Sequence, residues 1–270
     1  MIVFRDVSFT YPGAQRPALR RISLRFEAGQ RVAIVGANGS GKSTLARLAN
    51  GLLVPCEGSV LVDGMDTADE SRTFDIRSRV GLVLQNPDNQ IVGTVVEEDV
   101  AFGPENLGVP RDELRARVDA AIAAVGLTGM ERKEPHLLSE GQKQRLAIAG
   151  ALAMDPAYLV LDEPTAMLDA AGRHAILEVL ERLVTDGHGI VHITHDMAET
   201  IPADRVIALD DGKVAFDGPV AELLSNTHLL LRLGLEQPPM VVMAAVVRAN
   251  GLEVPLAPAP EELVEALWRS

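Results

Sequence analysis

Apolar residues in the first part of the chain recur with the spacing of short strands. Val3, Val7 and Phe9 fall on one face of an extended segment, and residues 22–26 alternate between apolar and polar side chains, with turn formers at 12–13 between them. Such alternation is typical of a strand with one buried face, and proline and glycine favour the connecting turn. The pattern predicts a small antiparallel sheet at the front of the chain.

Five short apolar runs follow, at residues 31–35, 80–84, 159–161, 190–193 and 206–209. Runs without alternation are typical of strands that are buried on both faces of a parallel sheet.

Helical patterns lie between these runs. Residues 44–50 read as a helix directly after the first run, 114–125 carry apolar residues at helical spacing, and 141–153 are rich in strong helix formers. The order of elements predicts an α/β fold in which a parallel-sheet core carries a helical insertion.

The chain changes character after residue 219, where prolines divide it into short pieces. These are Pro238, Pro239, Pro255, Pro258 and Pro260. The last piece, residues 261–269, places four apolar side chains on one helical face, namely Leu263, Val264, Leu267 and Trp268. This stripe packs either on a second subunit or on the chain's own core.

Composition narrows the choice of partners. The chain has 270 residues, 47% of them hydrophobic, and a formal net charge of −13. An acidic chain is a poor candidate for binding the phosphates of nucleic acids, although the same charge also serves solubility. The single cysteine, Cys56, excludes an internal disulfide, and no apolar run approaches the ~20 residues that span a bilayer. If the protein works at a membrane, other chains cross it.

Residues 36–44 read GANGSGKST and match the phosphate-binding pattern G-x-x-x-x-G-K-[ST] at every fixed position. The glycines let main-chain N–H groups close around phosphate oxygens, and the following helix points its positive end at the same anion. We expect Lys42 to reach the β- and γ-phosphates of ATP and Ser43 to bind Mg²⁺; the alternative is a chance glycine-rich turn. The expected nucleotide contacts in this loop are Gly36, Asn38, Gly39, Ser40, Gly41, Lys42, Ser43 and Thr44.

Two carboxylates end the apolar run at 159–161. Asp162 is expected to hold Mg²⁺, and Glu163 is then placed to orient and deprotonate the attacking water. An ordinary strand end with exposed acids is the alternative, but the P-loop upstream favours the second half of an ATP site.

Further motifs, in the same order along the chain, resemble those of ABC-type ATPases. Residues 138–142 read LSEGQ, like the signature sequence of that family. Gln85 ends a strand as the Q-loop glutamine does, Asp169 matches the D-loop aspartate, and His195 in ITHD matches the switch histidine. Tyr11 lies where the family has an aromatic residue that stacks on adenine.

The sequence is most similar to one branch of this family, the ATPase subunits of energy-coupling-factor (ECF) transporters. Residues 85–108, QNPDNQIVGTVVEEDVAFGPENLG, resemble the Q-loop of that branch and the helix after it, and residues 9–13 and 161–169 agree.

The resemblance implies an ABC-type P-loop ATPase with a RecA-like parallel-sheet core, an N-terminal antiparallel β subdomain, a helical subdomain and a small C-terminal extension. The ATPase domain is expected over residues 1–220, with the helical subdomain at about 88–155. Residues 221–270 form the extension, which is a candidate dimerisation element.

The resemblance also assigns roles to residues that the sequence places on helices and loops. Ser139 and Gln142 form a capping box that starts a helix, and this helix would present Ser139 and the Gly141 amide to the γ-phosphate held by a second subunit. His195 would bond the γ-phosphate and help to hold Glu163 and water in line. Gln85 is assigned to catalysis and to Mg²⁺, together with Ser43 and Asp162.

Each of these assignments has a simpler alternative. Ser139 and Asp169 could serve as helix caps alone, and Tyr11 could be sheet packing. Glu140 stands where the signature usually has glycine, so that either its carboxylate points away from the triphosphate or the signature works less well. An acidic cluster at residues 97–99 either pairs with arginines of a membrane scaffold or is a solvated helix face.

The resemblance as a whole implies the ATP-hydrolysing motor of an importer, a Mg²⁺-dependent ATPase bound peripherally to the cytoplasmic face of the cell membrane. Its expected partners are a second ATPase subunit, a transmembrane scaffold subunit and a substrate-binding membrane subunit, with no nucleic acid. Cobalt, nickel and vitamins remain open as cargo, and so do a homodimer and a heterodimer. The alternative is a soluble ABC ATPase without a transport role, which usually carries long insertions, a second cassette or a basic surface.

Overall fold

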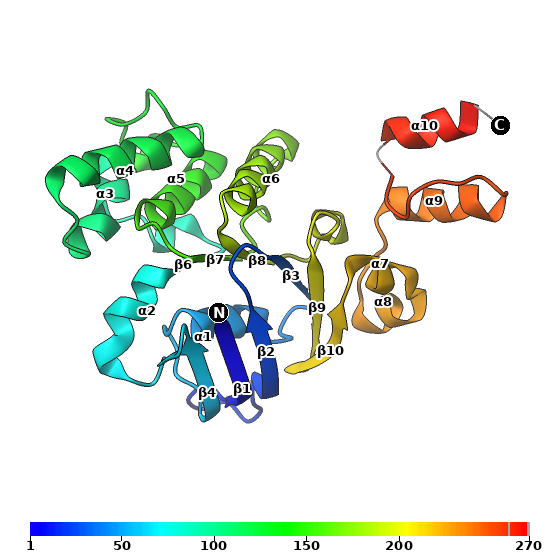
Figure 1. Cartoon of the computed structure of the whole chain (residues 1–270), viewed down its shortest axis with the longest axis horizontal. Coiled ribbons are helices and arrows are strands. Elements are labelled where there is room, and N and C mark those ends of the chain that lie inside the picture. Colours follow the sequence, from blue (N-terminus) through cyan, green and yellow to red (C-terminus); the bar gives the residue numbers. More distant parts are fainter. Residues whose placement is uncertain (259, 269–270) are drawn as a thin grey trace.

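The computed structural model describes residues 1–258 and 260–268, the side chains of 260 and 261 excepted. Two sheets and the helices around them form the main body, and the C-terminal helices extend from one side (Figure 1). Among the described residues no helix combines the length and the apolar character that crossing a bilayer requires.

A six-stranded sheet forms the centre, in the order β10-β9-β3-β8-β7-β6. All neighbours are parallel except the edge strand β10, which runs antiparallel to β9. The five predicted apolar runs are all strands of this sheet, whereas β10 was not predicted. The strands are β3 (Arg31–Val35), β6 (Val80–Val83), β7 (Tyr158–Asp162), β8 (Gly189–Ile193), β9 (Arg205–Asp210) and β10 (Lys213–Gly218).

The predicted N-terminal sheet is also present, but it has four strands in the order β2-β1-β4-β5. Its buried side chains include the edge-to-face pair of Phe4 and Phe26, whose ring centroids lie 6.1 Å apart. The sequence prediction missed β4 and β5 because both are short and Gly58 and Gly64 interrupt this stretch of the chain. The strands are β1 (Ile2–Phe9), β2 (Leu19–Phe26), β4 (Glu57–Val62) and β5 (Met65–Asp66).

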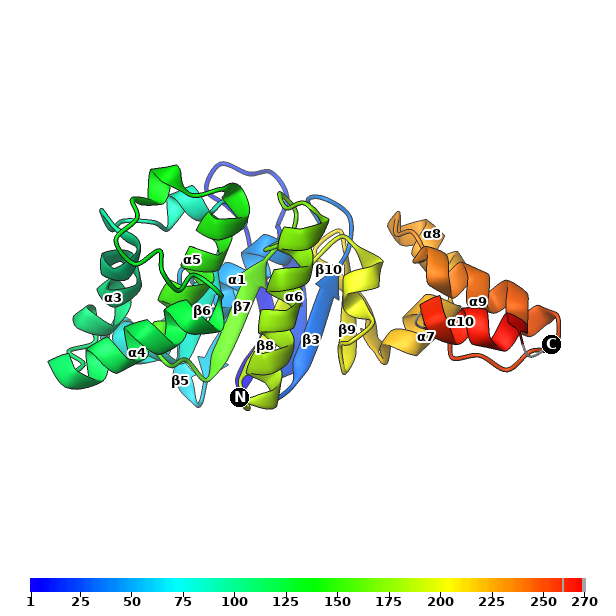
Figure 2. The same cartoon turned by 90° about the horizontal axis from the view of Figure 1, so that it is seen from above.

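The central sheet is covered on both faces, which explains why its strands are apolar without alternation. The helix α1 (Lys42–Ala49) and the N-terminal sheet pack on one face, and α5 (Glu140–Ala153) and α6 (Ala170–Thr185) pack on the other (Figures 1 and 2). Successive residues of β7 accordingly pack on opposite faces of the sheet. Val160 belongs to the hydrophobic cluster around α1, and Leu161 belongs to the cluster around α5 and α6.

The helical insertion consists of α3 (Val96–Asn106), α4 (Arg111–Ala124) and α5, which pack on one another. The helix α2 (Thr73–Arg79) leads into β6 on the same side of the molecule (Figure 1). The buried residues of α5 continue into the core beneath the sheet, so the insertion is fastened to the strands that carry the candidate site.

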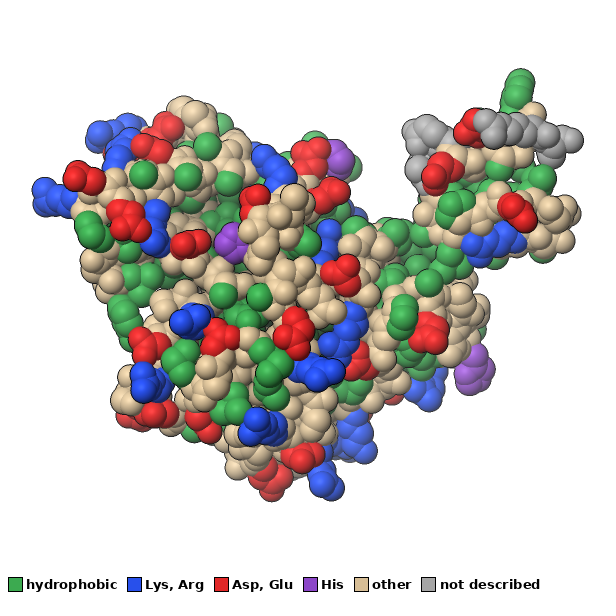
Figure 3. All heavy atoms as spheres, in the orientation of Figure 1, with side chains coloured by type: hydrophobic (Ala, Val, Ile, Leu, Met, Phe, Trp, Pro, Cys, Tyr) green, Lys and Arg blue, Asp and Glu red, His purple; other side chains and the backbone are tan. Residues whose placement is uncertain are grey.

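The C-terminal extension has two parts. The helices α7 (Val220–Ser225) and α8 (Thr227–Leu233) share a core with strands of the sheet, including Val206 and Ala208 of β9. Beyond them, α9 (Pro239–Ala249) and α10 (Pro260–Trp268) form a lobe with a small core of its own beside the main body (Figure 3).

The predicted apolar stripe of the last helix is only partly packed. Leu263 is buried in the small core, whereas Val264, Leu267 and Trp268 have exposed fractions of 60%, 49% and 90%. Of these four side chains, Leu263 is the one that is buried in the small core. The end of the predicted segment, Arg269, lies outside the described residues.

The shared core predicts that α8 contributes to the stability of the main body. Leu230 is 1% exposed and Leu231 is 74% exposed, so the two neighbours form a matched pair. Leu230→Ala should lower the free energy of unfolding by about 2–5 kcal/mol, because it leaves a cavity beside the sheet. Leu231→Ala should change it by less than about 0.5 kcal/mol. Urea denaturation of both variants measures the difference, and equal stability would mean that α8 is not part of this core.

Candidate functional site

A pocket of about 1000 Å³ opens at the carboxyl ends of the parallel strands. Its walls include the P-loop after β3, Gln85 after β6, Glu163 after β7 and His195 after β8. The carboxyl edge of an open parallel sheet is the usual place for a ligand, because loops from several strands converge there. The fold therefore gathers the predicted P-loop and the three predicted catalytic side chains in one cavity.

The P-loop depends on its glycines for different reasons. A side chain at Gly36 would place Cβ 2.2 Å from the main-chain oxygen of Leu209, and one at Gly41 would place it 2.6 Å from that of Ala18. Gly39 has open space around it but a φ of +80°, which disfavours other residues. Two of the glycines thus allow the loop to lie against its neighbours, and the third allows the turn.

Lys42 begins α1 and points back into the loop. Its Nζ donates to the main-chain oxygens of Gly36, at 2.7 Å, and Ala37, at 3.0 Å. Burial lowers the pKa of the Lys42 amine, and the nearby carboxylates of Glu163 and Asp162 act in the opposite direction. The amine is thus a buried donor at the floor of the pocket, suited to phosphate oxygens.

Asp162 ends β7 beside the P-loop and is 4% exposed. The pKa of its carboxyl group is raised by burial, and a hydrogen bond with the Ser43 side chain opposes part of this rise. The described residues contain no group of three or more His, Cys, Asp or Glu side chains that could enclose a metal ion. One buried carboxylate beside a hydroxyl fits Mg²⁺, which prefers oxygen ligands and takes most of them from water and phosphate.

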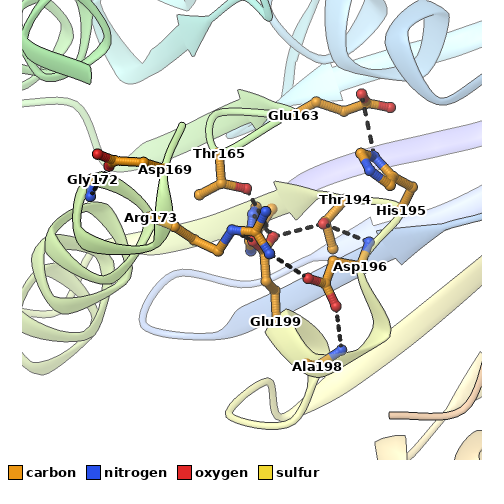
Figure 4. A network of polar contacts seen from close by, with 11 residues as sticks. Glu163, Thr165, Asp169, Gly172, Arg173, Thr194, His195, Asp196, Ala198 and Glu199 are labelled. Atoms are coloured by element: carbon orange, nitrogen blue, oxygen red, sulfur yellow. Dashed lines mark hydrogen bonds and ion pairs between the residues drawn. The ribbon is translucent and has the colours of Figure 1, made fainter. Parts of the chain in front are cut away.

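Glu163 follows Asp162 in an unusual backbone conformation, with a φ of +51°. Its N–H donates to the main-chain oxygen of Ile193, at 3.0 Å, so β8 holds the residue in place. Gln85 Nε2 donates to Glu163 Oε2 at 3.1 Å. His195 Nδ1 lies 3.5 Å from the same oxygen (Figure 4). Left-handed residues other than glycine persist where the surroundings hold them, and they concentrate at functional sites.

Tyr11 reaches the pocket from the loop between β1 and β2. Its hydroxyl lies 3.2 Å from Thr44 Oγ1, and its ring packs edge-on against Phe9 with centroids 4.9 Å apart. The residue therefore packs on the sheet and lines the pocket at once. Its predicted contact with adenine stays a prediction.

The signature residues lie elsewhere on the molecule. The predicted capping box is present: Gln142 N donates to Ser139 Oγ at 3.3 Å, and Ser139 N donates to Gln142 Oε1 at 3.0 Å. Ser139, Gly141 and Gln142 are not among the described residues that line the pocket. Lys143 Nζ lies 3.0 Å from Glu140 Oε1 and 2.9 Å from Asp88 Oδ1, so the carboxylate that replaces glycine is paired within its own helix.

Asp169 is the N-cap of α6, because its Oδ1 accepts a hydrogen bond from Gly172 N at 2.8 Å (Figure 4). Helix capping is therefore one role of this side chain, and its predicted D-loop role stays a prediction. Its own loop is exposed, since Met167 two residues earlier has an exposed fraction of 64%.

Two parts of the site were missed by sequence reasoning. Residues 234–239 of the C-terminal extension line the pocket, and so do residues 196–198, which follow His195. The first segment follows α8 through Gly234, which has a φ of +66°, and Gln237 Nε2 fastens it to Leu224 O at 2.6 Å. No local motif marks such a segment, because only the packing of α8 on the sheet brings it there.

Comparison with known proteins agrees with this site. Residues 19–166 match the ABC transporter family. The energy-coupling factor transporter ATP-binding protein EcfA1 of Symbiobacterium thermophilum is 52% identical over 98% of this chain and 96% of its own length. That of Caldanaerobacter subterraneus subsp. tengcongensis is 48% identical over 98% of both chains.

Solved structures show the same fold. The cbiO1 protein from Clostridium perfringens, described as part of the ABC transporter complex cbiONQ, has a TM-score of 0.76 and 35% identity over 86% of this chain and 94% of its own. The dimeric ATP-binding cassette MJ0796, in a post-hydrolysis state with ADP and phosphate, has a TM-score of 0.75 and 31% identity over 82% of this chain and 99% of its own. This chain therefore belongs to the ABC transporter ATPases and, within them, to the ATP-binding proteins of energy-coupling factor transporters.

Proposed function

We propose that this ATPase hydrolyses ATP through Glu163, positioned by Gln85 and His195, and that it drives an importer from the cytoplasmic face of the membrane. The observation that carries the proposal is the placement of Glu163. Its Oε2 lies 3.1 Å from Gln85 Nε2 and 3.5 Å from His195 Nδ1, at the edge of a pocket whose floor is a P-loop.

The chemistry is direct attack of water on the γ-phosphorus of ATP. Glu163 accepts the proton of this water, and His195 bonds the γ-phosphate and keeps Glu163 in line. Lys42 and the P-loop amides hold the phosphates. Ser43, Gln85 and Asp162 would hold Mg²⁺, which supplies positive charge to the phosphate oxygens when it is bound.

A second subunit completes the site. Ser139, Gly141 and Gln142 lie outside the pocket of their own chain, which supports a role at the pocket of a partner. The related cassette MJ0796 is described as dimeric, which supports the same arrangement. The pairing of Glu140 with Lys143 turns its carboxylate along its own helix and offsets its charge, so the signature tolerates this departure from glycine.

The membrane partner is proposed to dock in a groove of about 630 Å³ between α2, α3 and α5. Phe74 and Phe102 line it and have exposed fractions of 55% and 53%. Exposed aromatic side chains in a groove are typical of a helix-binding surface. The expected occupants are helices of a transmembrane scaffold subunit, which is joined in turn by a substrate-binding membrane subunit.

The structure changes the interpretation of the acidic cluster next to this groove. Glu97 already pairs with Arg115, at 3.2 Å, and with Arg132, at 3.0 Å. Asp99 Oδ1 accepts hydrogen bonds from the main-chain N–H groups of Val92 and Gly93, at 2.7 and 2.8 Å. These acids hold the chain's own loops, so apolar contact is the better basis for docking than pairing with the partner's arginines.

We also propose the following division of the chain. Residues 1–220 form the ATPase domain, with the helical subdomain at about 88–155, and residues 221–270 form the extension. Val242, Met243 and Val246 on α9 are exposed, as are Val264 and Trp268 on α10. This apolar surface supports the proposal that the lobe binds a second ATPase subunit.

The assignment of Glu163 predicts the effect of removing its basicity. Glu163→Gln keeps the size of the side chain but cannot accept the proton, so phosphate release should fall by at least about 100-fold. ATP binding should persist, and the variant should accumulate as an ATP-bound dimer. Phosphate release and light scattering with ATP measure the two effects. Turnover at the wild-type rate would contradict the assignment.

Docking in the groove predicts that a charge there weakens the membrane complex. Phe102→Asp should lower the amount of scaffold subunit that co-purifies from membranes, because the aspartate would be desolvated against an apolar helix. Val54→Asp, at a site that is 49% exposed and outside the groove, is the control. Equal yields for both variants would place the membrane partner elsewhere.

The exposed lobe predicts that a shortened chain dimerises less. A chain ending at Gln237 keeps α8 and loses α9 and α10, including Val241, which belongs to the core around α8. Its dimer population without ATP should be lower than that of the full chain, as measured by light scattering. An unchanged population would show that the lobe does not hold the subunits together.

A further inference from the structure

A buried carboxylate, Glu199, lies behind the hydrolysis site (Figure 4). It belongs to a short 3₁₀ turn, Met197–Thr200, that follows β8, and its side chain is 3% exposed. It is not among the described residues that line the nucleotide pocket. A carboxylate removed from water must find partners within the protein, so its contacts reveal what it holds together.

Its first partners are two hydroxyl groups from different loops. Thr194 Oγ1 donates to Glu199 Oε2 at 2.7 Å, and Thr165 Oγ1 donates to the same oxygen at 3.0 Å. Thr194 directly precedes His195, and Thr165 follows Glu163 by two residues. One oxygen atom therefore joins the loop that carries the proposed base to the loop that carries the switch histidine.

A third partner brings in the helix α6. Arg173, in the first turn of α6, donates from Nη1 to Asp196 Oδ2 at 2.7 Å, and its Nε lies 3.6 Å from Glu199 Oε1 (Figure 4). Asp196 directly follows His195, and Asp169 caps the start of the same helix. The start of α6 thus contacts Asp196, the residue after His195, and it also approaches the buried carboxylate of Glu199.

The contact between Arg173 and Glu199 is longer than a hydrogen bond. Arg173 Nε and Glu199 Oε1 are buried and have no hydrogen-bond partner among the described residues. A small shift of α6 would therefore form this bond or separate the two groups further. The contacts of the carboxylate with the Thr194 and Thr165 hydroxyl groups are already at hydrogen-bond length, so the contact with Arg173 is the one that a shift of α6 would adjust.

The remaining neighbour is His192 on β8, whose Nε2 lies 3.4 Å from Glu199 Oε2. Burial, aided by the positive charge of Arg31, lowers the pKa of His192 to about 3. The imidazole is thus neutral at neutral pH, and Arg173 is the cation that approaches Glu199 directly.

We propose that Glu199 is a positioning residue for ATP hydrolysis, which keeps His195 against Glu163 and, through Arg173, makes this placement depend on the position of α6. Since Asp169 caps the start of α6, a second subunit that presses on this exposed loop would move the switch histidine of the subunit that carries the loop. The inference rests on the proposed roles of Glu163 and His195.

The test is Glu199→Gln in the full chain. Glutamine keeps the size of the side chain, but it loses the charge that attracts Arg173 and one acceptor oxygen. Because a misplaced group slows chemistry more than binding, kcat should fall about 10- to 100-fold while the Kd for ATP stays unchanged. A wild-type kcat would overturn the proposal.

The matched control is Thr200→Val in the same turn. Thr200 is wholly buried, and its Oγ1 donates to Met197 O at 2.7 Å without touching the network. This variant should lower thermal stability but leave kcat unchanged. If Thr200→Val lowers kcat as much as Glu199→Gln does, the effect is loss of the turn, and the positioning role is refuted.

Arg173→Met provides a second variant in case Glu199→Gln does not fold, since the Arg173 side chain is 40% exposed. It should lower kcat and shift the NMR signal of the His195 imidazole in histidine-labelled protein, whereas Thr200→Val should do neither. A wild-type kcat or an unmoved His195 signal in Arg173→Met would overturn the link to α6.

Glu163→Gln separates this inference from the proposed function. If Glu163→Gln is inactive while Glu199→Gln and Arg173→Met turn over like the wild type, only the positioning role fails. If Glu163→Gln retains turnover, the proposed assignment of the base fails first.

Discussion

The parallel pairing of β3, β8 and β7 is the constraint on which the rest of the site depends. In this register Ile193 of β8 lies beside Ile34 of β3 on one side and Asp162 of β7 on the other. The three strands end together, so the P-loop, Glu163 and His195 emerge at one edge. The main-chain bond from Glu163 N to Ile193 O, at 3.0 Å, extends this pairing by one residue and holds the left-handed conformation of Glu163.

The sheet also buries a charged side chain at its other end, where β3 begins. Arg31 is 4% exposed, and burial lowers the pKa of its guanidinium group, while Glu181, Glu199 and Asp204 act in the opposite direction. Electrostatic interactions are stronger where water is excluded, and networks of this kind favour one arrangement of the loops over others. A site that is assembled from four loops needs such buried contacts, because the strand pairing reaches only the first residue of the loop at Glu163.

Two outer surfaces, the groove on the helical insertion and the C-terminal extension, are connected to the pocket through the cores of the sheet. The groove between α2, α3 and α5 shares a hydrophobic core with β7, the strand that ends at Asp162. The extension is anchored by α8 to the opposite edge of the sheet, and residues 234–239 bring it to the nucleotide pocket. The pocket thus lies between two surfaces that are suited to other chains.

The sequence alone determined the motifs and the order of the buried strands. The P-loop needs specific glycines at fixed spacing, and Asp162 and Glu163 end an apolar run, so local patterns suffice for both. The strands β4 and β10 escaped prediction because short segments between glycines carry little periodicity. Only the tertiary structure decided that Glu97 and Asp99 serve their own loops, that residues 234–239 reach the pocket, and that Glu199 joins three segments. These are contacts between residues far apart in the chain, and no local pattern encodes which partner a buried or paired charge will find.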